Sequence, residues 1–142
     1  MDESRAIICI GEGELLDEVL RLAGATGRAL ERVPDVVAAR RRWASASLVL
    51  LDESAARRCG EAGLARRARV IVVSRGDPRP SLRRHAVAVG AERVVALPDG
   101  ESWLARALVD AEGVAERGRV FAVVALLAWP VPRRPRRWPR PP

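Results

Sequence analysis

Four apolar runs in this 142-residue sequence end at positions that could carry or border a site. In chain order these positions are Gly11 with Glu12, then Asp52, then Ser74, and finally Leu97 with Pro98. Because carboxylate oxygens are the ligands that Mg²⁺ prefers, Glu12 and Asp52 are the two weak candidates for metal ligands. His85 is the only histidine and has no partners for a zinc site or a catalytic triad, so these residues alone predict no catalytic centre.

Short apolar runs alternate with amphipathic segments of helical length. The predicted strands are residues 6–10, 28–33, 48–51, 70–73 and 94–97. The predicted helices are residues 14–22, 34–43, 54–65, 81–89 and 102–112, with Ser81 as an N-cap. This alternation predicts a doubly wound α/β domain with a flavodoxin-like, five-stranded parallel sheet of order 2-1-3-4-5. The carboxyl ends of its strands would bring the positions above to one edge.

These strand ends resemble those of response-regulator receiver (CheY-like) domains. Residues 7–12 stand where receivers have an apolar strand and an acidic pair, and residues 48–52 match the strand that ends in the phosphoacceptor aspartate. Residues 70–74 match the strand that ends in serine or threonine, and residues 90–98 match the stretch that closes with lysine and proline. The resemblance implies a CheY-like fold and makes Asp52 the equivalent of the phosphoacceptor.

Two positions depart from the receiver pattern. The acidic pair that would hold Mg²⁺ is reduced to Glu12 beside Gly11, and Leu97 replaces the lysine that would neutralise a phosphoryl group. We therefore expect a pseudo-receiver without enzymatic activity or cofactor, in which Asp52 is an unphosphorylated turn or N-cap residue. The alternative is a true receiver that accepts a phosphoryl group on Asp52, with Glu12 for Mg²⁺ and Ser74 on the phosphoryl oxygens.

Residues 14–23, 36–43 and 94–104 together resemble a narrower family, the N-terminal receiver-like domain of septum-site-determining, CpaE-like proteins of high-GC Gram-positive bacteria. In that family the domain precedes an ATPase of the MinD/ParA type. The resemblance implies a regulatory, protein-binding module in cell division or pilus assembly, with such an ATPase or its assembly as partner. Receivers commonly make contacts through the fourth helix, fifth strand and fifth helix, here residues 81–112.

The end of the chain departs from that family after a receiver-like domain of residues 1–117. Residues 118–128 resemble the first strand of the ATPase, but residues 125–130 lack the glycines and the lysine of a P-loop. Residues 129–142 form a Pro/Arg/Trp tail that we expect to be disordered. Our hypothesis is a frameshift or truncated gene, which reading the genomic DNA beyond this point in the other frames would test. The alternative is a genuine tail that binds anionic surfaces.

Charge and composition restrict the remaining classes of function. The formal charge of +7 comes mostly from the tail, since five of the 25 arginines and none of the 18 acidic residues follow residue 128. Nucleic-acid binding is therefore expected only non-specifically, through the tail. Cys9 and Cys59 are expected to be free thiols, with Cys59 in a surface turn. The sequence lacks a signal peptide and any run of the ~18 apolar residues of a membrane span, which predicts a cytoplasmic protein without a transmembrane segment.

Overall fold

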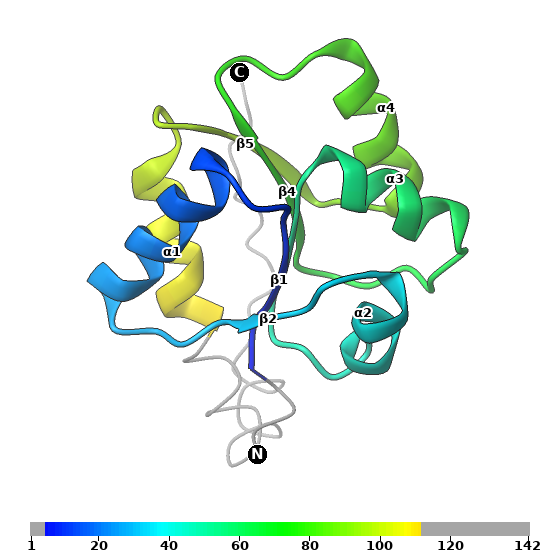
Figure 1. Cartoon of the computed structure of the whole chain (residues 1–142), viewed down its shortest axis with the longest axis horizontal. Coiled ribbons are helices and arrows are strands. Elements are labelled where there is room, and N and C mark those ends of the chain that lie inside the picture. Colours follow the sequence, from blue (N-terminus) through cyan, green and yellow to red (C-terminus); the bar gives the residue numbers. More distant parts are fainter. Residues whose placement is uncertain (1–4, 112–142) are drawn as a thin grey trace, which may run out of the picture.

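The structure, a computed structural model, describes residues 5–111 (Figure 1). The strands are β1 (Ile7–Cys9), β2 (Glu31–Arg32), β3 (Val49–Leu51), β4 (Val70–Arg75) and β5 (Arg93–Leu97). The helices are α1 (Glu14–Thr26), α2 (Val36–Arg42), α3 (Glu53–Glu61) and α4 (Pro80–Val89). A last helix occupies residues 101–111. The predictions for residues 118–128 and 129–142 lie outside the described residues.

The sheet has the predicted topology. Its strand order is β2-β1-β3-β4-β5, and every neighbouring pair of strands is parallel. In register, Cys9 of β1 lies opposite Leu51 of β3, and Leu51 lies opposite Val72 of β4. The residues that follow these strands therefore lie at the same edge of the sheet, where the candidate site residues come together. The strand order and the parallel pairing confirm the predicted fold.

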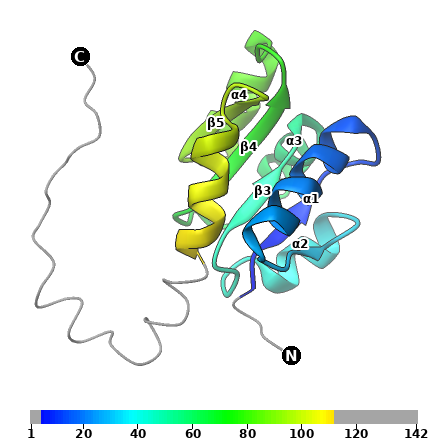
Figure 2. The same ribbon diagram turned by 90° about the vertical axis from the view of Figure 1, so that its left-hand side faces the viewer.

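Helices cover both faces of the sheet (Figure 2). Successive strand residues point to opposite faces, so an uninterrupted apolar run is required when both faces are buried. One core lies under α1 and the last helix and includes Ile8, Leu50 and Leu97. The other lies under α2, α3 and α4 and includes Cys9 and Cys59. Within residues 5–111, no helix combines the length and the apolar character that crossing a membrane requires.

The helix ends follow from side-chain chemistry that the sequence displays. The carboxylate of Asp35 accepts a hydrogen bond of 2.9 Å from the Ala38 N–H and thereby caps α2. α1 and α4 end at Gly27 and Gly90, whose φ angles of 75° and 81° lie in the left-handed region that glycine adopts without strain. These caps fix where α2 begins and where α1 and α4 end.

Cys59 corrects one prediction, because it is fully buried in α3 instead of exposed in a turn. The small side chains of Ala55 and Ala56 share its face and let the helix pack closely on the sheet. Burial, with a smaller contribution from nearby Cys9, raises the pKa of the Cys59 thiol to about 11. Cys59 is thus a protonated core residue.

We expect the free energy of unfolding to fall as the pH rises from about 9 to about 11, the ordinary and folded pKa values of the Cys59 thiol. In this window the unfolded chain has lost the thiol proton and the folded protein keeps it, so raising the pH favours unfolding. Urea unfolding at several pH values measures the slope. A Cys59→Ala variant should show a shallower slope, and equal slopes in the two proteins would contradict the expectation.

Candidate functional site

Asp52 lies between β3 and α3, where two backbone amides hold its carboxylate. Oδ1 accepts a hydrogen bond of 2.8 Å from the Ala55 N–H and caps α3, and Oδ2 accepts one of 2.9 Å from the Gly11 N–H. The N–H of Asp52 donates in turn to the Cys9 carbonyl at 3.3 Å. The predicted N-cap role is confirmed, and the bond to Gly11 also joins the end of β1 to the start of α3.

Gly11 and Glu12 continue from β1 along the same edge as Asp52. A Cβ atom added at Gly11 would lie 3.7 Å from Asp52 Oδ2, which is ordinary van der Waals contact. All three residues line a hollow of about 550 Å³, together with Cys9. The structure therefore brings the two candidate metal ligands to one hollow. Within residues 5–111, however, no group of three His, Cys, Asp or Glu side chains is arranged to hold a metal ion.

Ser74, in the second half of β4, lies on the other side of Asp52. Both residues line a second hollow of about 500 Å³, which Arg79 also borders. The side chain of Ser74 is buried, and its Oγ donates a hydrogen bond of 2.8 Å to the Gly76 carbonyl. The Ser74 hydroxyl therefore donates its hydrogen bond within the turn that leads from β4 to α4.

Leu97, the last residue of β5, sends its side chain into the core under α1 and the last helix. It is fully buried and lines neither of the two hollows that Asp52 borders. Only its backbone approaches the candidate edge, where its carbonyl accepts a hydrogen bond of 2.8 Å from the Gly76 N–H. Of the predicted site residues, Leu97 is thus the one whose side chain does not reach the site.

Two arginines that the sequence analysis did not single out line the first hollow. Arg32 lies in β2 and Arg58 lies in α3, and both are exposed. Within the described residues neither forms an ion pair. Burial raises the pKa of the Cys9 thiol in the same hollow, with Asp52 adding to the effect, so this thiol is neutral. No sequence motif connects these residues, because the order of β2, β1 and β3 brings them together.

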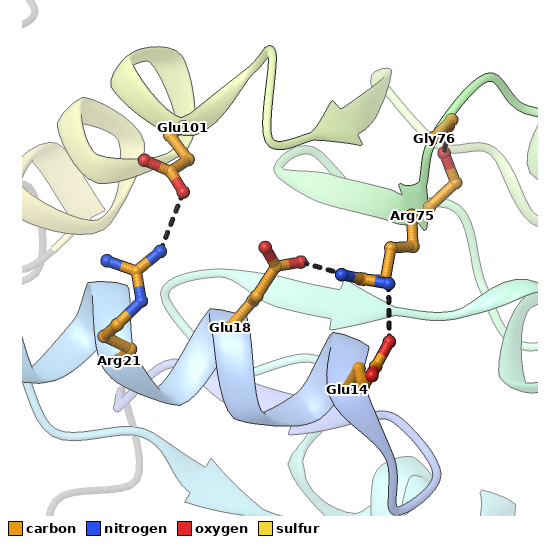
Figure 3. A network of polar contacts seen from close by, with 7 residues as sticks. Glu14, Glu18, Arg21, Arg75, Gly76 and Glu101 are labelled. Carbon is orange, nitrogen blue, oxygen red and sulfur yellow. Dashed lines mark hydrogen bonds and ion pairs between the residues drawn. The ribbon is translucent and has the colours of Figure 1, made fainter.

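Ion pairs fasten α1 to the end of β4 and to the last helix (Figure 3). Arg75, which ends β4, lies 2.6 Å from Glu14 and 3.3 Å from Glu18 of α1. Further along α1, Arg21 lies 2.7 Å from Glu101 at the start of the last helix. Exposed pairs such as these contribute roughly 0–1 kcal/mol each. The two pairs of Arg75 hold the end of β4 beside α1, and the pair of Arg21 with Glu101 holds the start of the last helix beside α1.

Glu53, next to Asp52, connects the start of α3 to the start of α4 through hydrogen bonds. Its carboxylate accepts hydrogen bonds from the Ser81 hydroxyl at 2.7 Å and from Arg79 at 2.8 Å, and these bonds lower the pKa of Glu53. His85 Nε2 lies 4.0 Å from the same carboxylate. Ser81 was predicted to be the N-cap of α4, and this prediction is wrong. The N-cap residue is Arg79, and Pro80 follows it in the first turn, where the fixed φ angle of proline suits a helix.

Solved structures of receiver domains share this fold. A response regulator receiver domain protein (CheY-like) from Methanospirillum hungatei JF-1 gives a TM-score of 0.55 at 15% identity and covers 80% of this chain and 97% of its own. The pilus assembly protein cpaE from Burkholderia thailandensis E264 gives a TM-score of 0.52 at 18% identity and covers 77% of this chain and 98% of its own. These comparisons define the class: the fold is that of a CheY-like receiver domain.

The family follows from the sequence comparison. The profile of the Rv3660c-like, CheY-like N-terminal domains matches residues 9–119, and the chain belongs to this family. The uncharacterised protein Rv3660c of Mycobacterium tuberculosis (strain ATCC 25618 / H37Rv) is 36% identical over 115 residues, which are 80% of this chain and 33% of that protein. The chain thus spans about a third of the length of the curated relatives it matches. The predicted resemblance to a receiver-like N-terminal domain is confirmed, and the fold is shared with the cpaE protein.

Proposed function

We propose that this domain is a pseudo-receiver, a non-catalytic regulatory module that works by binding another protein and is not phosphorylated on Asp52. The observation that carries the proposal is the use of the Asp52 carboxylate, whose two oxygens accept the Gly11 and Ala55 amides. Phosphorylation of Oδ2 would disturb the contact that joins β1 to α3, and phosphorylation of Oδ1 would disturb the cap of α3. Leu97 supports the same proposal, because a buried leucine cannot neutralise the charge of a phosphoryl group.

The partner that we propose is an ATPase of the MinD/ParA type or its assembly, in septum placement or pilus assembly. Two findings support it: the fold is shared with a cpaE pilus assembly protein, and the family is described as an N-terminal domain. The proposed contact surface is residues 81–112. Val87 in α4 is 71% exposed there and is available for such a contact.

Treatment of the full chain with a small-molecule phosphodonor and Mg²⁺, read by intact mass, tests the proposal. We expect no gain of a phosphoryl group, with an active receiver treated in parallel to show that the donor works. A folded Asp52→Asn variant is the control for any gain. A gain in the wild type that this variant removes would overturn the pseudo-receiver proposal.

A second candidate, a true receiver, is favoured by one observation: Asp52 shares one hollow with Glu12 and the other with Ser74. A Gly11→Asp variant tests whether the second carboxylate of the acidic pair is the only group that phosphorylation lacks. The variant restores that carboxylate at a position with room for a Cβ atom. Under the pseudo-receiver proposal this variant also stays unphosphorylated, since no cation replaces Leu97. Phosphorylation of Gly11→Asp alone would show that only the acidic pair was lacking.

The third candidate, an anionic-surface binder, depends on residues 129–142, which lie outside the described residues. It stays a prediction, as does the cytoplasmic location. Deleting residues 129–142 should abolish binding to anionic vesicles if the five arginines of the tail carry it.

A further inference from the structure

α2 and α3 lie on the face of the sheet opposite to α1 (Figures 1 and 2). Together with the end of β2 they carry a strongly basic surface. Four exposed arginines form it, and we call it the α2–α3 basic surface: Arg32, Arg40, Arg41 and Arg58. Arg32 and Arg58 line the same hollow. Arg40 Nη2 lies 3.5 Å from the Ala62 carbonyl, one turn after Arg58, so α2 presents this arginine to the end of α3.

The charges of this surface are not neutralised within the fold. In the described part of the chain, Arg32, Arg41 and Arg58 form no ion pair, and Arg40 bonds only a neutral carbonyl. Of the neighbouring acids, Glu31 pairs with Arg42 and Glu61 pairs with Arg57, whereas, within residues 5–111, Glu12 and Asp52 line the hollow without forming an ion pair to these arginines. The surface thus presents four guanidinium groups that an external anionic partner could bind.

Apolar groups accompany these charges. Val37 of α2 is 62% exposed, and the exposed Pro34 lines the hollow between Arg32 and Arg58. Interfaces bury apolar surface beside charged pairs that set orientation and association rate. A partner that satisfies both features carries carboxylates and apolar side chains together.

One feature favours a protein partner over a nucleic acid. Stacking of single-stranded bases requires exposed aromatic side chains. Among residues 5–111 the only aromatic side chains are the buried Trp43 and Trp103, which packs on the opposite face of the sheet.

We propose that the α2–α3 basic surface binds an acidic, amphipathic segment of a partner protein. The inference rests on the proposed function of the domain as a protein-binding module and deepens it by stating the chemistry of the partner and the surface that receives it. This surface is separate from residues 81–112, so the two contact regions can be tested independently.

The test uses the full chain and a fluorescein-labelled peptide of glutamate and leucine at helical spacing, followed by fluorescence anisotropy. An Arg40→Gln/Arg58→Gln variant removes two charges from the surface. An Arg83→Gln/Arg84→Gln variant removes two exposed charges from α4 and leaves the same net charge and the same tail, so it is the matched control. We expect the first variant to bind about tenfold more weakly than the wild type and the control to bind within about twofold of it.

Equal losses in the two variants, or no loss in either, would overturn the proposal, because binding would then depend on overall charge or on the tail. Stronger loss in the α4 variant would move the contact to residues 81–112 and leave the proposed protein-binding function intact. A labelled oligothymidylate provides the other comparison. If it binds more tightly than the peptide and loses affinity in the Arg40→Gln/Arg58→Gln variant, the surface takes nucleic acid and the proposal is wrong.

Discussion

A Leu97→Lys variant is expected to be less stable than the wild type by about 3–5 kcal/mol and to remain unphosphorylated. The Leu97 side chain is fully buried between the sheet, α1 and the last helix, and its core cluster within residues 5–111 is apolar and offers a lysine ammonium group no carboxylate. Burying an unpaired charge in an apolar core is strongly unfavourable. Restoring the residue type of active receivers at this position therefore damages the fold instead of repairing a site.

Urea unfolding of the Leu97→Lys variant measures this loss, with Leu97→Met as the control. Methionine keeps the apolar volume and should cost less than about 1.5 kcal/mol. The same samples are treated with the phosphodonor. A Leu97→Lys protein as stable as the wild type that also gained a phosphoryl group would show that the lysine reaches the edge of the sheet. The buried, structural role assigned to the Leu97 side chain would then be wrong, whereas the pseudo-receiver proposal itself depends on the result for the wild type.

An Asp52→Ala variant is expected to lower the free energy of unfolding by about 2–4 kcal/mol. Alanine removes the cap of α3 and also the acceptor of the Gly11 N–H, so two backbone amides lose their charged partner. A residue kept only as a phosphoacceptor would show little loss of stability on substitution. The expected loss is therefore a direct measure of the structural role that Asp52 has in this domain.

Asp35→Ala is the matched control for Asp52→Ala. Asp35 caps α2 through one hydrogen bond to Ala38 and has no contact equivalent to Gly11, so its loss should cost about 1 kcal/mol. The difference between the two variants estimates the contribution of the bond between β1 and α3. Equal losses would contradict the structural role that we assign to that bond.

The sheet was predictable wherever burial on two sides left a signal in the sequence. The central strands β1, β3 and β4 each read as an uninterrupted apolar run, because helices cover both of their faces. β2 was harder: residues 28–33 were predicted, and only Glu31–Arg32 form the strand. An edge strand pairs on one side only and needs no such run. Cys59 was misplaced because Gly60 and Gly63 follow it and are typical of a turn, although the helical period carries it to the buried face.

The sequence predicted which residues lie at the candidate site, but it did not predict the contacts between them. Strand ends indicated which residues would meet at one edge, and Asp52 as an N-cap followed from its place before a helix. The bond from Gly11 to Asp52 spans 41 positions in the sequence and depends on the register of β1 with β3. The approach of Arg32 to Arg58 depends likewise on the strand order, which no local pattern encodes.

The direction of the last helix determines how the domain can communicate with whatever is joined to it. That helix starts near the carboxyl end of β5 and returns to the opposite edge, where Asp110 shares a hollow with Arg69 at the start of β4. Residues 101–111 span roughly 16 Å at 1.5 Å per residue. A domain connected after residue 111 is therefore attached at the end of the fold that lies away from Asp52. The length of the connecting segment then sets the effective concentration at which the two ends can meet.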